Sequence, residues 1–486
     1  MTNKIFTSID DAKEFLYSKF GKDESFDVCI KDLHVYSLPI LCVYISGLVD
    51  GNTITEQLTP LFHDYGKTDE WEKEIEDEDK YFNDHFNFYG KSEPKDRDEF
   101  LLGVLSGQVG IITKSGFGYV LELRSYPGRQ PDEPDNEKVI RGSRDGFAEN
   151  IMLNTALIRR RIRTADLRFE LNKVTAIGQT DVAIAYINGL TNEKNLKWLK
   201  KRLSEINHDG LTMSDKSLEE WLFKQKFHPL PFVRYSERPD IVSAHLLEGH
   251  IAIIVDTSPS VIIVPISMFH LLQHAEEYRQ SPFIGTTMRF LRYFAAFFTL
   301  TLLPIWYLLA THEEFLPAAL DFIGAKEKSS IPLFLQIIIA HLGLEYLRIA
   351  AIHTPTPLST AMGLVAGIII GQIAIDVGLF SPEVILYTAV TAIFSFSIPT
   401  FELSVALKYF QFFILIMTAL AGVNGFFISI FILFSYLCSL KPMKVPYLWP
   451  LIPFFPKAFS RVFIRFPMAD DAIRPYIVGA KQRDRS

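Results

Sequence analysis

The residues best suited to chemistry lie together in one apolar stretch, LSTAMGLVAGIIIGQIAIDVGL, at positions 358–379. On an α-helix that turns 100° at each residue, four of its side chains fall within an arc of about 60°: Val365, Ile369, Gln372 and Asp376. Gln and Asp are costly when they face lipid, so this face should meet protein or water. In a ring of copies, Gln372 and Asp376 would line a pore that favours cations, and the two aliphatic residues would form its constriction.

Small residues occupy the other side of the same predicted helix. Within an arc of about 80° lie Thr360, Ala374 and four glycines: Gly363, Gly367, Gly371 and Gly378. Helix backbones can approach closely along such a face, which suits packing between copies. The alternative stays open that the glycines only pack within a monomer and that Asp376 lies at headgroup level beside Glu383.

A second apolar stretch carries charged residues on one stripe. His341, Glu345 and Arg348 share a helix face, and the last two are three residues apart and can form an intramembrane ion pair. Such a group could relay protons or ions. It could equally be an ion pair that anchors the end of the helix at the membrane interface.

The elements that must position these residues are long apolar spans near 290–311, 331–350, 358–380, 384–401 and 403–440. A helix needs roughly 20 residues to cross the hydrocarbon core. The last span is too long for one untilted helix, and a break is expected at Ala421–Gly425, so one or two crossings remain possible. Basic residues before the first span and after the last one predict a multi-pass membrane protein with both termini in the cytoplasm.

The part of the chain before these spans reads as soluble protein and contains an internal repeat. CVYISGLV at 42–49 resembles IAYINGLT at 184–191, and LSGQVGII at 105–112 resembles LEGHIAII at 247–254. Gly47 and Gly189 are as far apart along the chain as Gly107 and Gly249, and such a constant offset indicates tandem duplication.

The predicted fold class is an α+β membrane protein, with tandem duplicated α/β cytosolic subdomains before an all-α transmembrane bundle. The expected domains are a first subdomain at 1–130 with a charged insertion at 66–99, a second subdomain at 131–280, a transmembrane domain at 288–440 and a basic cytosolic tail at 441–486.

Four arginines end a predicted helix that follows the proline-rich linker: Arg159, Arg160, Arg161 and Arg163. Asp145 could cap the start of this helix, and the arginines favour its dipole at the end. The arginines could bind phosphate or nucleic acid. The reading favoured by the acidic composition is a surface helix that pairs with acidic neighbours or lipid headgroups.

Composition excludes several classes of function. The net charge of −7 argues against a nucleic-acid partner. Cys29, Cys42 and Cys438 are too scattered for a disulfide framework or a metal site. Phosphate-binding loops, nucleophile elbows and zinc-protease motifs are absent, so we expect neither an enzyme nor a cofactor.

The order of several motifs resembles the A subunits of GerA-type spore germination receptors over nearly the whole chain. These motifs are RGSRDGF at 141–147, NTALIRRRI at 154–162, ERPD at 237–240, GHIAIIVDTSPSVIIVP at 249–265, EYLR at 345–348 and GLVAGIIIGQ at 363–372. HAEEYRQSP at 274–282 and FLPAALDFIG at 315–324 are similar to one branch of that family, the stage V sporulation AF proteins.

The resemblance implies a protein of the spore inner membrane whose soluble subdomains face the spore core. It implies homo-oligomers, pentamers in the family, that form a cation channel with the GLVAGIIIGQ helix as pore helix. It also implies a small membrane partner, other receptor subunits and surrounding membrane lipid. Two rivals remain: a non-conducting scaffold or signalling subunit, and a solute transporter, which would predict inverted repeats that the spans do not show.

Overall fold

The computed structural model of the 486-residue chain divides into two compact units, each described by itself. The first comprises Met1–Lys226, Val233–Ile266 and Met468–Ser486, and the second comprises Phe227–Phe232 and Ser267–Pro467. The residues described by the structure are 4–35, 38–52, 54, 56, 90–126, 134, 137–225, 227–312, 314, 323–324, 331–353, 363–365, 367–467 and 478–479.

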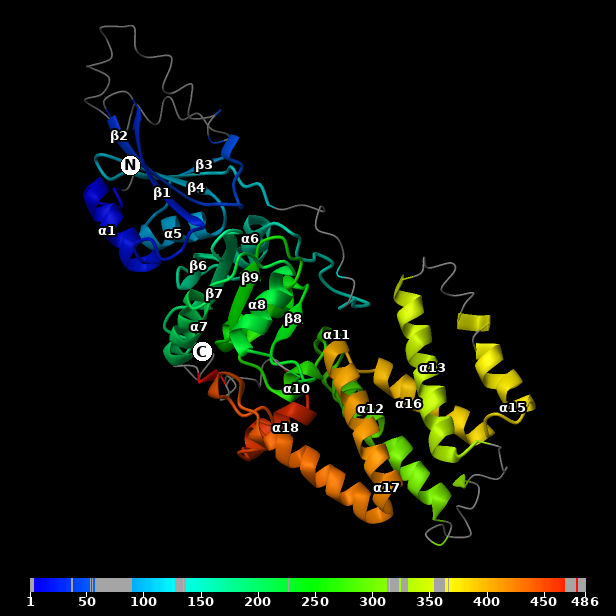
Figure 1. Cartoon of the computed structure of the whole chain (residues 1–486). Helices are drawn as coiled ribbons and strands as arrows, with labels where there is room; N and C mark the ends of the chain where they lie inside the picture. The colour runs from blue at the N-terminus through cyan, green and yellow to red at the C-terminus, as the bar shows by residue number, and fades with distance from the viewer. Residues whose placement is uncertain are drawn as a thin grey trace, which may run out of the picture. The chain divides into compact units, whose positions relative to one another are not determined.

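The first unit contains two antiparallel sheets of five strands with the same strand order (Figure 1). The first sheet runs β1 (Val28–Val35), β2 (Leu38–Ile45), β4 (Val109–Thr113), β5 (Gly118–Leu121) and β3 (Lys91–Ser92). The second sheet runs β6 (Leu167–Val174), β7 (Thr180–Ile187), β9 (Ile251–Val255), β10 (Val261–Val264) and β8 (Arg234–Ser236).

The two sheets repeat in register as well as in order. Cys42 on β2 pairs with Ile111 on β4, and Ile184 on β7 pairs with Ile253 on β9. Each residue of the second pair follows its counterpart in the first by one and the same offset, which is also the offset of the repeated motifs. The described helices of the first repeat are α1 (Ile9–Phe20) and α5 (Arg97–Leu105). Those of the second repeat are α6 (Ile151–Arg161), α7 (Glu193–Ser204), α8 (Ser214–Phe223) and α9 (Pro239–Glu248).

The charged segment at 66–99, predicted as an insertion, does not make the first repeat longer than the second. The stretch of chain from Ile45 to Val109 is as long as the stretch from Ile187 to Ile251, so the two repeats have equal chain between these strands. Residues 90–99 form β3 and the start of α5, which are the counterparts of β8 and α9. The rest of the predicted insertion lies outside the described residues.

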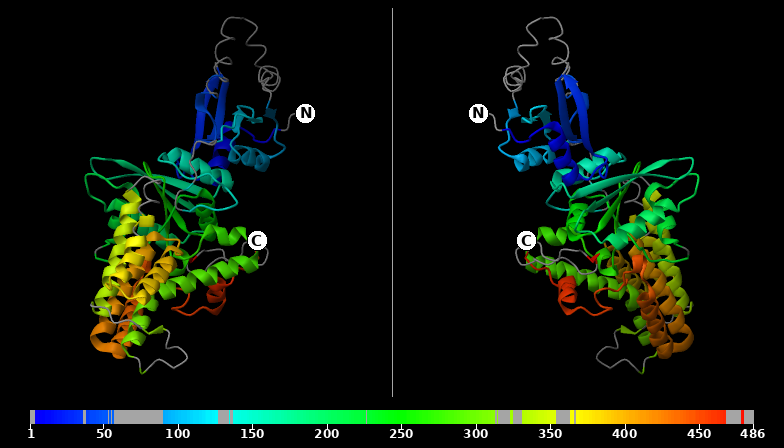
Figure 2. Two further views of the ribbon diagram at one scale, coloured as in Figure 1. Left: turned by 90° about the vertical axis from the view of Figure 1, so that its right-hand side faces the viewer. Right: turned by 90° about the vertical axis from the view of Figure 1, so that its left-hand side faces the viewer.

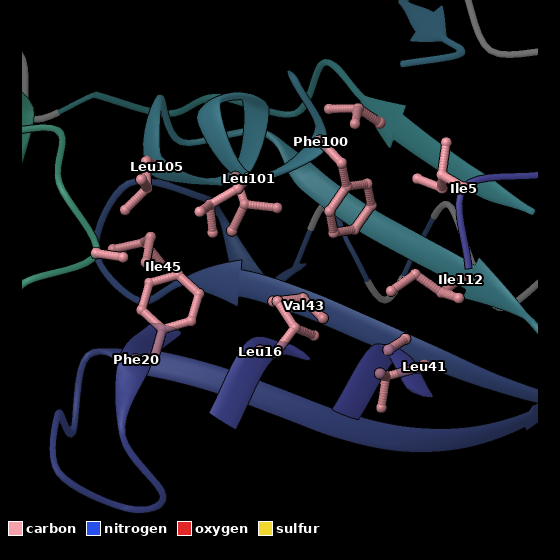
Figure 3. Close-up of a cluster of buried hydrophobic side chains, with 14 of the residues drawn as sticks. Ile5, Leu16, Phe20, Leu41, Val43, Ile45, Phe100, Leu101, Leu105 and Ile112 are labelled. Atoms are coloured by element: carbon pink, nitrogen blue, oxygen red, sulfur yellow. The ribbon is translucent and has the colours of Figure 1, made fainter. Parts of the chain in front are cut away.

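Apolar side chains on one face of the first sheet are buried under α1 and α5 (Figure 3). Leu16 and Phe20 of α1 meet Val43 and Ile45 of β2 in this core, because helix positions four apart share a face and strand positions two apart do. Ser8 caps α1 by accepting a hydrogen bond from the Asp11 amide, and Gly21 ends it at a φ of 73°.

The second unit is built from helices, several of which lie alongside one another (Figure 2). It contains α10 (Met268–Leu271), α11 (Ala275–Arg279), α12 (Pro282–Thr311), α13 (Leu333–His353), a π-helical segment (Ile368–Ile373), α15 (Ala374–Asp376), α16 (Pro382–Phe396), α17 (Phe401–Ser439), a 3₁₀ turn (Pro442–Lys444) and α18 (Pro456–Phe463). Residues 267–280, predicted to end the second subdomain, fall in this unit.

Candidate functional site

Three helices of the described chain are long and apolar enough to cross a membrane: α12, α13 and α17. The shorter apolar helix α16 has 15 residues, about 22 Å of helix. α12 starts before the predicted span, at Pro282, because Ser281 caps it and proline suits its first position. The predicted third span, 358–380, lies outside the described residues before position 363.

The expected break in the last span is confirmed. Ala421 and Gly422 leave the helical conformation, Gly422 at a φ of 56°. In one straight helix Phe410 and Tyr436 would be about 39 Å apart, whereas their ring centroids are 6.1 Å apart. The segment is therefore a helical hairpin of two arms. A Cβ on Gly425 would collide with the Met417 carbonyl oxygen, so the reversal requires glycine there.

The glycine-rich segment is helical, but its geometry differs from the prediction. Residues 368–373 are π-helical, and their i→i+5 bonding adds about one residue to a turn. Residues after this segment are therefore rotated by about 100° relative to a uniform α-helix. Asp376 does not share the arc of Val365 that uniform spacing predicted. That Val365, Ile369, Gln372 and Asp376 line a pore stays a prediction.

This helix is largely uncovered by the rest of the described chain. The side chains of Val365 and Ile369 are 54% and 51% exposed, and Gln372 and Asp376 are at least partly exposed as well. Apart from adjacent residues and the backbone of the same helix, no described atom lies within 4 Å of where a Cβ would stand on the four predicted packing glycines: Gly363, Gly367, Gly371 and Gly378. Gly363, Gly367 and the predicted pore residues thus lie on a surface that the rest of the described chain leaves uncovered.

Glu345 is the centre of a mostly buried charged cluster between α13 and α17. Arg348 Nη2 lies 2.5 Å from Glu345 Oε2, Lys408 Nζ bonds to Oε1, and His341 Nε2 is 4.0 Å from Oε1. One carboxylate thus meets two cations. Arg348 also lies over the Phe401 ring. Sequence reasoning missed Lys408, although it is the one charged residue within 403–440.

A second ionic cluster joins the start of α12 to the end of the unit. Glu277 is fully buried and binds Arg289, with Nε 2.6 Å from Oε2, and also binds Arg292. Arg289 Nη1 donates to the Arg461 carbonyl at 2.8 Å, and Arg465 Nη2 donates to the Tyr278 carbonyl at 2.9 Å. Residues 461–465 are thereby fixed to the first turns of α12.

Two of the four arginines after the linker, Arg159 and Arg161, form ion pairs within the first unit. Arg159 is fully buried and binds Asp27 of the first repeat through Nε and Nη2, at 2.9 and 3.1 Å. Arg161 binds Asp145, so Asp145 does not cap α6, whose cap is Asn150. Pairing with acidic neighbours is correct, but the prediction of a surface position is wrong for Arg159, because its partner belongs to the other repeat.

Two buried titratable groups of the first unit, His250 and Cys42, are held neutral. Burial lowers the pKa of His250 to about 4 and raises the pKa of the Cys42 thiol to about 12. Neither group is charged at neutral pH. Among the described residues, no group of three or more His, Cys, Asp or Glu side chains could hold a metal ion.

Comparisons with known proteins agree with the motif order. The family model described as Bacillus/Clostridium GerA spore germination protein matches residues 14–477. Stage V sporulation protein AF of Bacillus subtilis is 44% identical over 99% of this chain and 97% of its own length. Spore germination protein KA of Bacillus subtilis is 31% identical over 98% of this chain and 88% of its own length.

A solved structure is also similar to this chain. It is the crystal structure of the N-terminal domain of the A subunit of the Bacillus megaterium spore germinant receptor GerK3. It is 28% identical, has a TM-score of 0.39, and covers 55% of this chain and 97% of that one. The family match and the two relatives cover nearly all of the sequence, so this chain belongs to the GerA family of spore germination proteins.

Proposed function

We propose that this protein is a non-enzymatic subunit of the spore inner membrane and that several copies form a cation channel used in germination. The observation that carries the proposal is the uncovered helix at 363–376. An apolar helix exposed along its glycines and its polar residues needs lipid on one side and other protein on another. Copies packed through the glycines would bring Gln372 and Asp376 to a shared lumen.

The contacts within the helical unit support an even number of crossings. The hairpin of α17 returns the chain to the side from which it entered. Arg289 donates hydrogen bonds to the backbone carbonyls of residues 461 and 462. These bonds support a placement in which the start of α12 and the end of the helical unit lie on the same side of the membrane. With basic residues at both ends, that side is the cytoplasm or spore core. Relatives named as spore germination proteins support association with other germination components.

A non-conducting scaffold is the second candidate. The rotation introduced by the π segment favours the scaffold, because it turns Asp376 away from the helix face that carries Val365, so that the two side chains do not point into the same lumen. Potassium conductance of the purified protein in planar bilayers separates the two.

The channel predicts conductance in the wild type and a larger leak in Val365→Ser, since a polar side chain removes the apolar constriction. Leu364→Ser is the matched control, because Leu364 is 68% exposed and lies about 100° around the helix. If neither the wild type nor Val365→Ser conducts potassium in planar bilayers, the channel is refuted and the scaffold is the function that remains.

A further inference from the structure

A row of aromatic rings joins the segment after α17 to the first turns of α12. Centroids of Phe454 and Phe459 are 5.4 Å apart, those of Phe459 and Phe463 are 4.9 Å apart, and Phe463 lies 4.8 Å from Tyr293 and 5.9 Å from Phe290. Phe454 and Phe290 remain 61% and 51% exposed. The row therefore has an outer edge that the described chain does not cover.

This row stands where α12 changes from charged to uncharged sequence. Arg292 is the last charged residue, and the stretch 293–311 that follows makes about 28 Å of helix, close to the thickness of a hydrocarbon core. The stretch 282–292 extends about 16 Å beyond it. Phe290 and Tyr293 straddle the boundary, where aromatic side chains gather at membrane interfaces.

The segment 441–467 is cationic. It contains five basic residues and no acidic one. Lys441, Lys444 and Lys457 are exposed, whereas Arg465 is buried against carbonyl oxygens of the helical unit. These exposed lysines belong to the same segment as three rings of the row, Phe454, Phe459 and Phe463, and this combination suits a surface with an anionic outer layer and an apolar layer beneath it.

The way α18 is held fixes its apolar side chains at this level. The Tyr293 hydroxyl donates to the Val462 carbonyl at 3.1 Å, and the Arg465 amide donates to Thr286 Oγ1 at 3.1 Å. Val462 is buried, while Ile464 and Phe466 stay 43% and 39% exposed. α18 and the residues just after it are thus attached to α12 through Val462 and Arg465, whereas Ile464 and Phe466, which follow α18, are left uncovered.

From this geometry we propose that residues 441–466 form an interfacial collar that binds anionic phospholipid headgroups around the start of α12. The proposal rests on the membrane insertion proposed above, but not on conductance. A lipid leaflet is favoured over a protein partner because the patch continues directly into the apolar surface of α12. The lysines lie on the side that the positive-inside rule assigns to anionic lipid.

The test uses full-length protein in mixed micelles, with the thermal midpoint followed as phosphatidylglycerol replaces phosphatidylcholine. The double variant Lys444→Gln/Lys457→Gln should show an apparent affinity for the anionic lipid about 30-fold weaker, since each lysine near such a surface contributes a factor of about five. Lys197→Gln/Lys201→Gln is the matched control, because these α7 lysines are 79% and 78% exposed. It should behave as the wild type.

Three outcomes overturn the collar: equal midpoints in both lipids, an unchanged affinity in the double variant, or the same shift from inorganic phosphate alone. Failure of membrane insertion is scored separately, by whether the protein enters lipid nanodiscs at all. Inserted protein that is silent in bilayers but responds to phosphatidylglycerol would refute the channel and keep the collar.

Discussion

Substitution of Asp27 by Asn should strongly destabilise the first unit, because it leaves the fully buried Arg159 without its carboxylate. Asp27 accepts two hydrogen bonds from Arg159 and one from the Ser25 hydroxyl at 2.7 Å, and it is 1% exposed. Removing one partner of a buried pair costs about 3–5 kcal/mol. At about 2–4 °C per kcal/mol, the midpoint of unfolding should fall by roughly 6–20 °C.

The duplicated fold supplies a matched control at Asp166. The Asp27 carbonyl accepts from the Ser46 amide at 2.7 Å, and the Asp166 carbonyl accepts from the Asn188 amide at 2.8 Å, so the two aspartates hold equivalent positions. Asp166 is exposed, and Asp166→Asn should change stability by less than about 0.5 kcal/mol.

The assay is thermal unfolding of the purified full-length protein in detergent, followed by fluorimetry and by protease sensitivity of the first unit. Asp27→Leu combined with Arg159→Met should recover much of the loss, because an apolar pair removes the orphaned charge. Equal midpoints for Asp27→Asn and Asp166→Asn would refute the claim that this ion pair holds the repeats together.

Three other substitutions test separate contacts. Gly47→Ala should destabilise by about 1–3 kcal/mol more than Gly189→Ala in chemical denaturation: both glycines have positive φ, but only at Gly47 would a Cβ meet Ala156 and Met152, at 3.0 and 3.1 Å. His250 has a folded pKa of about 4, below the ordinary 6.5, so the free energy of unfolding should fall by up to about 3 kcal/mol as the pH drops from 6.5 to 4. Thermal melts at a series of pH values should lose this pH dependence in His250→Leu and keep it in His208→Leu. Glu345→Gln leaves Lys408 and Arg348 without a carboxylate and should lower stability by about 3–5 kcal/mol, whereas the exposed Glu402→Gln should not; equal melting points would contradict the cluster's role.

The duplication could be predicted because its signal lies in residues that the backbone requires. Gly47, Gly189, Gly107 and Gly249 all have positive φ, at 83°, 74°, 90° and 99°. Both repeats therefore keep glycine at the same two turns, and a constant offset survives. The insertion was mispredicted because composition was read as length: the chain between β2 and β4 is as long as the chain between β7 and β9.

The helical unit was harder to predict for reasons that lie in three dimensions. The break at Gly422 is visible in sequence, but the pairing of Glu345 with Lys408 depends on which helices meet, which no local spacing encodes. The π segment escapes prediction as well, since Ile-Ile-Ile-Gly suits either helical form. Its consequence is mechanistic: with Asp376 rotated by about 100° from the arc of Val365, a lumen lined by both needs the π turn to revert on assembly. Retention of the π turn in assembled copies would leave only one of these residues facing the axis, so Val365→Ser and Asp376→Asn should then not both alter conductance.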